Sequence, residues 1–346
     1  NCSPLEILKL QKNLKQIAEG EGIEFVCGKG KHKPEIQKLY EELEMCGTRL
    51  MEYKECFEIM GKERNSYSKT DLEATFMRMK EDHMLNGQLK PAYNVQIAVE
   101  NYFIVHSYIS NDRTDYNTLI PVLEKHRGAF GDSLEAVTAD SGYCSEKNLL
   151  YLKENGIQSY IKLQDHEKRK TRAYKEDIGK YYNMTYAVFE DEHYYICHDG
   201  RELRHIRTES KEQDGYTQTI EVYGCADCGG CEHKSKCLYK YNAAKNPDRN
   251  KVMKINERWE ELREESNANI QSEEGVLKRQ TRSIQTEGHF GDIKENENFR
   301  RFNYRSKEKV YKEFMLYAIG RNIMKYHRFL HGEIEKYEGK KDQKAA

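Results

Sequence analysis

The chain has 346 residues, of which 37% are hydrophobic and 33% charged, a composition typical of a globular protein with a polar surface. Its net charge of −1 argues against a protein that binds polyanions through bulk charge alone. The sequence has no apolar run of the about 18 residues that a membrane-spanning helix requires, and no secretory signal pattern, so we expect no membrane partner. Because it begins with Asn1, we expect a fragment or a processed product.

The first segment, residues 1–88, is expected to be helical. Apolar residues recur in it at spacings of 4 and 3, the period of one helix face, at Leu39, Leu43, Cys46, Leu50, Tyr53, Phe57 and Met60. A shorter stripe of the same kind is formed by Leu10, Leu14 and Ile17. Glycines separate the two stripes, which favours a helical hairpin; a coiled-coil arm that pairs two chains is the alternative.

Residues 89–164 carry the pattern of an α/β core. Two stretches rich in β-branched and aromatic residues, 93–99 and 102–109, flank a tight turn and predict a β-hairpin. A helix, a strand, a second helix and a second strand are then predicted at residues 118–126, 134–139, 145–155 and 157–163. This order favours a mixed sheet with covering helices.

Residues 165–262 interrupt this order and are expected to form an insertion domain, in which charged residues precede short predicted strands. Residues 263–332 are expected to be helical again. Within them Met315, Ile319, Ile323 and Tyr326 are spaced 4, 4 and 3 apart, which predicts a buried helix face. Residues 333–346 are charged and are expected to be disordered.

Four cysteines lie close together inside the insertion: Cys225, Cys228, Cys231 and Cys237. Four thiolates at this spacing match a tetrahedral structural zinc site, whereas the Cys-x2-Cys-x2-Cys run also suits an iron–sulfur cluster. A cluster without metal is a third interpretation, and Cys197 could replace one ligand. Zinc held by four thiolates has no open coordination position, so it would stabilise the fold without taking part in catalysis.

Two acidic residues are candidates for catalysis. Asp140 follows the apolar run 134–139 and precedes a turn-forming Ser-Gly, and Glu287 lies in a long proline-free segment with basic neighbours. Two such carboxylates can share divalent metal ions in phosphodiester chemistry, so the pair points to an enzyme that acts on nucleic acid. The simpler interpretations are that Asp140 caps the helix after it and that Glu287 is an ordinary surface residue.

The late segment is strongly basic. From Lys278 to Arg328 it holds 13 lysines and arginines against 6 aspartates and glutamates, which favours a surface that faces phosphates; a solvated helix face is the alternative. Lys294 lies seven residues after Glu287, on the same helix face, and Arg282 lies five before it. The candidates for DNA contact are Arg282, Lys294, Arg300, Arg301 and Arg305.

Six strings carry a resemblance to a known family: RNSYSKTD (64–71), ATFMRMKEDHMLNGQLKPAYNVQIAVE (74–100), DRTDYNTLIPVL (112–123), ADSGY (139–143), RSIQTEGHFGDIK (282–294) and FRRFNYR (299–305). In this order they resemble the DDE transposases of bacterial insertion sequences, of the insertion-sequence 4-like and 1182-like group. The match runs from about residue 20 to residue 330.

The resemblance implies an RNase H-like core, in which the second acid, at Asp140, ends the fourth strand. It also implies a third acid at Glu287 on a late helix, and an insertion between the two that often carries cysteines. The acids would hold two Mg²⁺ ions for strand cleavage and transfer at transposon ends. The implied partners are double-stranded DNA, at the transposon ends and the target, and a second copy of the chain, in the bacterial cytoplasm at the nucleoid.

One part of the family pattern is missing. The first acid normally lies on the first strand in an Asp-Gly-Thr context, and no such string occurs here; Asp71 is the nearest acid. We therefore expect a chain that is truncated at its N-terminus and inactive by itself. A non-catalytic, transposase-derived DNA-binding or regulatory protein is the alternative, and a metal-dependent nuclease without strand transfer is a third.

Overall fold

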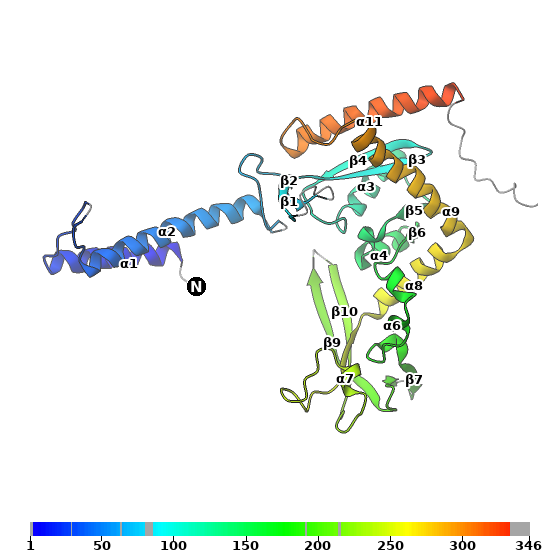
Figure 1. The fold of residues 1–346 in the computed structure, drawn as a ribbon, viewed down its shortest axis with the longest axis horizontal. Coiled ribbons are helices and arrows are strands. Elements are labelled where there is room, and N and C mark those ends of the chain that lie inside the picture. Colours follow the sequence, from blue (N-terminus) through cyan, green and yellow to red (C-terminus); the bar gives the residue numbers. More distant parts are fainter. Residues whose placement is uncertain are drawn as a thin grey trace, which may run out of the picture. The chain divides into compact units, whose positions relative to one another are not determined.

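The structure, a computed structural model, describes residues 3–28, 30–62, 64–79, 86–190, 192–213 and 216–332 (Figure 1). The chain divides into two compact units. The first contains Asn1–Asn94, Ile109–Arg113 and Asn303–Val310, and the second contains Val95–Tyr108, Thr114–Phe302 and Tyr311–Ala346. Across the described ranges, no helix is long and apolar enough to cross a membrane. Residues 333–346, which were expected to be disordered, lie outside the described residues.

The first unit begins with two helices that pack together, α1 (Pro4–Gly20) and α2 (Glu35–Met60). Ser3 caps α1, because its hydroxyl accepts from the Glu6 amide at 3.3 Å while Glu6 Oε2 accepts from the Ser3 amide at 2.6 Å. Gly47 of α2 faces α1, since a Cβ at this position would lie 3.3 Å from Cγ2 of Ile7. These contacts form the helical hairpin that the two stripes predicted.

The apolar stripe predicted for α2 is not buried. Leu39, Tyr53 and Phe57 are 52%, 56% and 67% exposed. The buried residue of the helix is Gln37, whose side-chain amide bonds both backbone groups of Val26, at 2.8 and 2.9 Å. The 4–3 spacing therefore identified the helix but not the face that it buries, because loop residues and not a second apolar stripe cover Gln37.

Residues 75–78 depart from the helix expected over residues 1–88. β1 (Thr75–Arg78) pairs antiparallel with β2 (Leu89–Ala92). The strand pair begins at Thr75, a β-branched residue that is 1% exposed. A β-branched side chain packs well on a pleated surface, which favours the strand over the helix here.

The α/β core lies in the second unit. Its strands form the hairpin pair β3 (Asn94–Glu100) and β4 (Phe103–Ser110) and the parallel pair β5 (Ala136–Ala139) and β6 (Gln158–Ile161). The sequence predicted one mixed sheet, whereas the described strands form separate two-stranded sheets. At the edge of β4, the N–H and C=O of Ile104 bond the side chain of Asn322, both at 2.9 Å, so these backbone groups are satisfied without a further strand.

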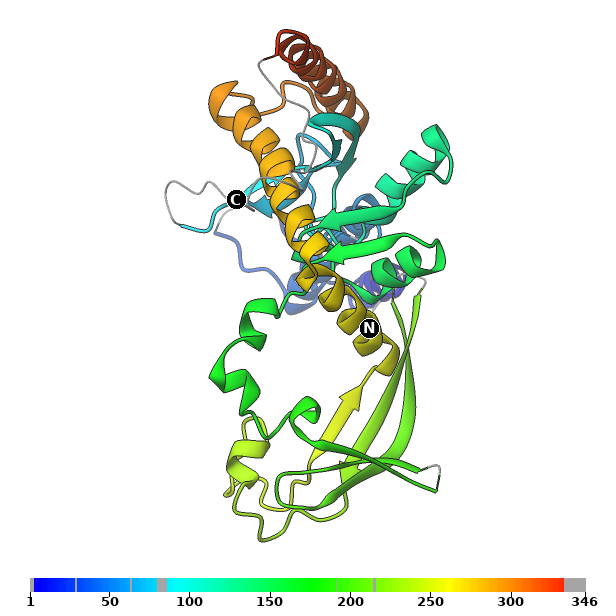
Figure 2. The ribbon, with the colours of Figure 1, turned by 90° about the vertical axis from the view of Figure 1, so that its right-hand side faces the viewer.

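Helices surround these strands (Figure 2). They are α3 (Leu119–Phe130), α4 (Glu146–Glu154), α8 (Glu257–Gln271), α9 (Glu273–Arg282), α10 (Gly288–Gly291) and α11 (Lys307–Leu330). Two π-helical turns, Ser283–Glu287 and Asp292–Asn296, flank α10. Leucines of α3, α4 and α8 share one apolar core with Ile161 of β6. This packing fixes α8 against β6, where the Ser266 hydroxyl donates to the Ile161 carbonyl at 2.9 Å.

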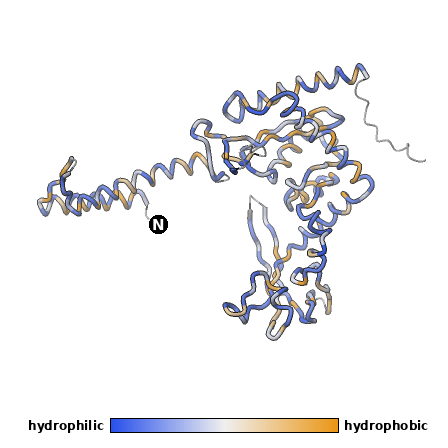
Figure 3. Tube along the Cα trace, in the orientation of Figure 1, coloured by the Kyte–Doolittle hydropathy of each residue, from blue (hydrophilic) through white to orange (hydrophobic). Residues whose placement is uncertain are grey.

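Residues 185–255 contain a five-stranded antiparallel sheet with the strand order β11-β10-β9-β8-β7. Its strands are β7 (Thr185–Phe189), β8 (Glu192–Ile196), β9 (Glu202–Gln213), β10 (Tyr216–Cys225) and β11 (Val252–Ile255). Short helices lie at α5 (His166–Arg169), α6 (Arg172–Lys175) and α7 (Lys234–Cys237). The β9–β10 hairpin is largely hydrophilic (Figure 3), and Leu203 and Tyr223 are among the few side chains that it buries.

The buried face of α11 differs from the predicted one. Met315, Ile319, Ile323 and Tyr326 are 37%, 48%, 64% and 56% exposed. The side chains that the helix buries are instead Val310, Phe314, Ala318 and Arg321, also spaced 4, 4 and 3 apart. The prediction had the correct period and the wrong phase, because a buried arginine continues the true face.

We predict opposite effects for the same substitution at two helical glycines. A Cβ at Gly275 in α9 would lie 2.0 Å from the Asn269 carbonyl oxygen, whereas one at Gly320 in α11 would meet nothing within 4 Å. Gly275→Ala should lower the free energy of unfolding by about 2 kcal/mol through overpacking. Gly320→Ala should raise it by about 0.5–1 kcal/mol, since alanine favours the helix. Urea unfolding of the full chain measures both; equal shifts in one direction would contradict the helix packing described here.

Candidate active site

Asp140 lies at the end of β5, where the strand gives way to the 3-10 turn Ser141–Tyr143. Its Oδ1 accepts a hydrogen bond from the Gly142 amide at 2.8 Å, so it caps this turn. Its Oδ2 faces Arg282, whose guanidinium lies 3.5 Å away, and the side chain is half-exposed. Asp140 thus caps the turn with one oxygen and presents the other to a cationic group.

Glu287 ends the π-helical turn Ser283–Glu287 and is 60% exposed. Its Oε1 pairs with Arg282 Nη1 at 2.9 Å, and its Oε2 accepts from the Ser283 hydroxyl at 3.1 Å. The guanidinium of Arg282 therefore contacts both candidate acids, although one follows β5 and the other lies on the late helical segment. The structure therefore places Asp140 and Glu287 beside the same guanidinium.

A third carboxylate, Asp115, lies beside Asp140 and was missed by the sequence analysis. A Cβ at Gly142 would lie 2.8 Å from Asp115 Oδ2 and 3.0 Å from Asp140 Oδ1, so both carboxylates approach the same glycine. Gln96, which is buried, donates to Asp115 Oδ1 at 2.8 Å and accepts from the Tyr143 hydroxyl. The available signal was the DRTD string just before the predicted helix, but spacing alone did not connect it to Asp140.

The electrostatics of this group follow from its charges. Burial raises the pKa of Tyr143, the nearby Asp115 and Asp140 raise it further, and Arg282 partly offsets them. Tyr143 therefore stays protonated and serves as a hydrogen-bond donor. Among the described residues, no group of three or more His, Cys, Asp or Glu side chains is arranged to hold a metal ion. The structure holds instead a carboxylate pair that shares one cationic side chain.

The basic candidates divide between the two units. Arg282 and Lys294 belong to the second unit, as do Arg300, which pairs with Glu295 at 2.7 Å, and the exposed Arg301. Arg305 belongs to the first unit, where its Nη1 donates to the Thr70 carbonyl at 3.5 Å. Four of the five candidates therefore lie in the same unit as the carboxylate pair.

Asp71, the acid considered in the sequence for the family's first position, lies in the first unit and has other partners there. Its Oδ2 accepts from the Ser306 amide at 3.2 Å and from the Tyr93 hydroxyl at 2.9 Å. Two residues later, Glu73 accepts from the Lys307 amide at 2.7 Å. These carboxylates engage the N-terminus of α11, where unpaired amides and the helix dipole favour negative charge.

The cysteine cluster does not have the geometry of the predicted zinc site. No metal-holding group of three or more side chains occurs where the structure describes the chain, the four cysteines included. The Cys225 thiol donates to the Asp227 carbonyl at 3.2 Å, and Cys228 Sγ accepts from the Lys251 amide at 3.4 Å. Burial, helped by the neighbouring Cys228, raises the pKa of the Cys225 thiol to about 11. The spacing predicted metal ligands, whereas the structure shows Cys225 and Cys228 bonded to nearby backbone groups.

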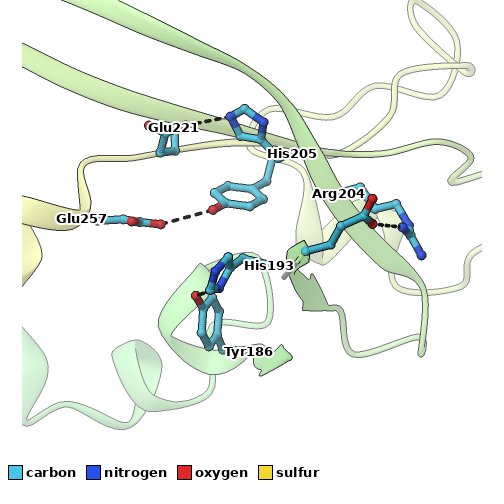
Figure 4. A pocket seen from close by; sticks show the side chains of 8 residues that line it. Tyr186, His193, Arg204, His205, Glu221 and Glu257 are labelled. Carbon is cyan, nitrogen blue, oxygen red and sulfur yellow. Dashed lines mark hydrogen bonds and ion pairs between the residues drawn. The ribbon is translucent and has the colours of Figure 1, made fainter. Parts of the chain in front are cut away.

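A cavity of about 520 Å³ lies in the five-stranded sheet (Figure 4). It is lined by Tyr186, Glu192, His193, Arg204, His205, Glu221, Tyr223 and Glu257. Its polar groups pair with one another: His205 with Glu221 at 2.7 Å, and the Tyr223 hydroxyl with Glu257 at 3.1 Å. None of the sequence-predicted site residues lines this cavity.

Comparison with known proteins supports one enzyme class. Residues 196–327 match a family model described as "Transposase DDE domain". This range contains Glu287, Arg282 and Lys294, and it begins after Asp140. The match supports a DDE transposase, a nuclease-type enzyme with DNA as its substrate, and agrees with the mixed α/β structure. Neither the curated proteins nor the solved structures include a match to the chain.

The cysteine geometry gives a prediction for thiol reactivity. Since the raised pKa of Cys225 leaves about one thiolate in a thousand at pH 8, iodoacetamide should modify the exposed Cys46 long before the buried Cys225. The Cys225 rate should rise about tenfold per pH unit up to about pH 10. Peptide mass spectrometry follows both residues, and modification in urea, where burial is lost, is the control. Equal modification rates for Cys46 and Cys225 in the folded chain would contradict the burial and raised pKa described for Cys225.

Proposed function

We propose that the chain is a DDE transposase of an insertion sequence, in which Asp140 and Glu287 bind the catalytic Mg²⁺ ions for DNA strand cleavage and transfer at transposon ends. The observation that carries this proposal is the guanidinium of Arg282, which lies 2.9 Å from Glu287 and 3.5 Å from Asp140. A cation between two carboxylates is the charge arrangement that a divalent metal requires. The family match supports the same class, because Glu287 lies inside the matched range.

The donor chemistry fits magnesium. Carboxylate oxygens are hard ligands, and Mg²⁺ is usually bound by one or two of them while it keeps several waters. Asp140 and Glu287 are 48% and 60% exposed, which leaves room for such waters. When bound, Mg²⁺ would lower the pKa of an attacking water or 3′-hydroxyl and stabilise the leaving oxygen.

The side chains around the pair have distinct proposed roles. The Gly142 amide holds Oδ1 of Asp140 and leaves Oδ2 facing Arg282, and the Ser283 hydroxyl holds Oε2 of Glu287 and leaves Oε1 facing the same guanidinium. Arg282 balances both negative charges and, beside a bound metal, would be free to contact a phosphate. Asp115 is proposed as a further carboxylate of the site, oriented by Gln96.

The DNA contacts are proposed for the basic residues that follow. Lys294, Arg300 and Arg301 lie in the segment after Glu287, and Arg305 lies a few residues later. Their charges would neutralise phosphates of the duplex, so binding should weaken steeply as salt rises. A second copy of the chain is proposed to bring the two transposon ends together.

The alternative function is a DNA-binding regulator without catalysis. One observation favours it: Asp71 is engaged at the start of α11 and is not placed as a metal ligand beside another carboxylate of its own unit among the described residues. In that case the chain would bind transposon ends and block them. Mg²⁺-dependent nicking of end DNA by the full chain separates the two functions.

We predict that the metal site is measurable without DNA. Mn²⁺, a paramagnetic substitute for Mg²⁺, should bind the full chain, and Asp140→Asn or Glu287→Gln should each weaken binding about tenfold or more through the loss of a ligand. Asp115→Asn should weaken it less. Electron paramagnetic resonance of free Mn²⁺ measures the affinity.

The matched control for this measurement is Glu274→Gln. Glu274 lies on α9, is also 60% exposed, and pairs with Lys278 at 3.4 Å, so it matches Glu287 in exposure and in having a basic partner but does not contact Arg282 or Ser283. This variant should bind Mn²⁺ as the unmodified chain does. If Glu274→Gln and Glu287→Gln were indistinguishable, the proposed site would be wrong.

A further inference from the structure

Two side chains on either side of Glu287 hold both backbone polar groups of Tyr102. The Tyr102 amide donates to Gln285 Oε1 at 3.3 Å, and the Tyr102 carbonyl lies 2.8 Å from His289 Nε2. Gln285 and His289 are 7% and 2% exposed, whereas Glu287 between them is 60% exposed. The helical segment is therefore anchored on one face while Glu287 points from the other.

The backbone of Tyr102 is held in place by the β3–β4 hairpin. This residue follows Asn101 in the turn between β3 and β4, and both residues have positive φ angles, 48° and 69°. This conformation suits the tight turn of a β-hairpin, whose strands fix the turn on both sides. A helix that bonds both groups of Tyr102 is thus held against the end of a hairpin.

The anchor also determines the state of His289. A carbonyl oxygen only accepts, so Nε2 must carry the proton and donate to Tyr102. Nδ1 then accepts from Arg321 Nε, at 3.2 Å. Arg321 is itself 5% exposed and is held by Asp292 at 2.9 Å and by Glu297. The imidazole is consequently fixed at both nitrogens by groups outside its own turn.

Glu287 depends on such an anchor because its other contacts are local. Ser283 and Arg282 lie four and five residues before it on the same segment. The turn that they share is π-helical, a geometry that persists mainly where tertiary contacts support it. Apart from the 3.5 Å pair between Arg282 and Asp140, these contacts lie within the segment itself and do not fix where it stands relative to β5.

We propose that Gln285 and His289 are positioning residues that hold Glu287 opposite Asp140, with Arg321 fixing the ring of His289. The proposal rests on the proposed function where it treats Glu287 as a metal ligand. The anchoring itself concerns only the second unit and does not depend on any metal.

The test compares three variants of the full chain. His289→Leu removes both ring nitrogens, whereas His289→Gln keeps a donor near the position of Nε2. His106→Leu is the matched control, because His106 is also buried, lies on β4, and has no hydrogen-bond partner at Nε2. Hydrogen–deuterium exchange of residues 283–291 reports the anchor, and Mn²⁺ affinity reports the position of Glu287.

We expect His289→Leu to speed exchange in residues 283–291 about tenfold and to weaken Mn²⁺ binding about tenfold. His289→Gln should keep most of the slow exchange and most of the Mn²⁺ affinity of the unmodified chain. His106→Leu should change neither the exchange rate of residues 283–291 nor the Mn²⁺ affinity, whatever its effect on overall stability. The proposal is overturned if residues 283–291 exchange in His289→Leu as they do in the unmodified chain, or if His106→Leu speeds their exchange equally. It is also overturned if exchange becomes faster in His289→Leu while the Mn²⁺ affinity is unchanged. If the unmodified chain binds no Mn²⁺, the proposed function fails, and exchange alone still decides whether His289 anchors the segment.

Discussion

The ion pairs of Arg282 are the interaction on which the rest of the site depends. Without a cation between them, the carboxylates of Asp140 and Glu287 would repel each other, since like charges at close range disfavour ionisation. Arg282 is only 21% exposed, so its charge is screened less than that of a surface lysine. The Gly142 amide and the Ser283 hydroxyl each hold one oxygen of these acids, and the other oxygen of each acid faces this charge.

The position of Asp140 could be predicted from the sequence because strand ends and turns have local signals. The surroundings of Glu287 could not be predicted in this way. An apolar run that stops at Asp-Ser-Gly predicts a strand end with a capped turn, and the structure has both. Glu287 carries no local signal of this kind, because its neighbours in space come from the β3–β4 turn and from α11. Asp115 was missed for the same reason, since its link to Asp140 runs through Gln96 and Gly142.

The two errors of helix face have a common physical cause. Hydrophobic spacing identifies a helix, but it assigns the buried face only when polar residues stay outside. Gln37 in α2 and Arg321 in α11 are buried because each satisfies several hydrogen bonds there. The cysteines show the same limit: their spacing is that of a zinc site, yet Cys225 and Cys228 bond nearby backbone groups. In each case a hydrogen-bond partner that the spacing does not reveal decided the outcome.

The buried Arg321 links these observations to the site. A guanidinium inside a protein needs partners for its charge, and Asp292 and Glu297 lie on the segment just after α10. The arginine therefore ties α11 to the helical segment that carries Glu287, and its Nε holds the ring of His289. A leucine at position 321 would satisfy the apolar face of α11 but would leave that segment without this tie. The polar interruption that hid the buried face from the sequence analysis is thus the contact that supports the position of Glu287.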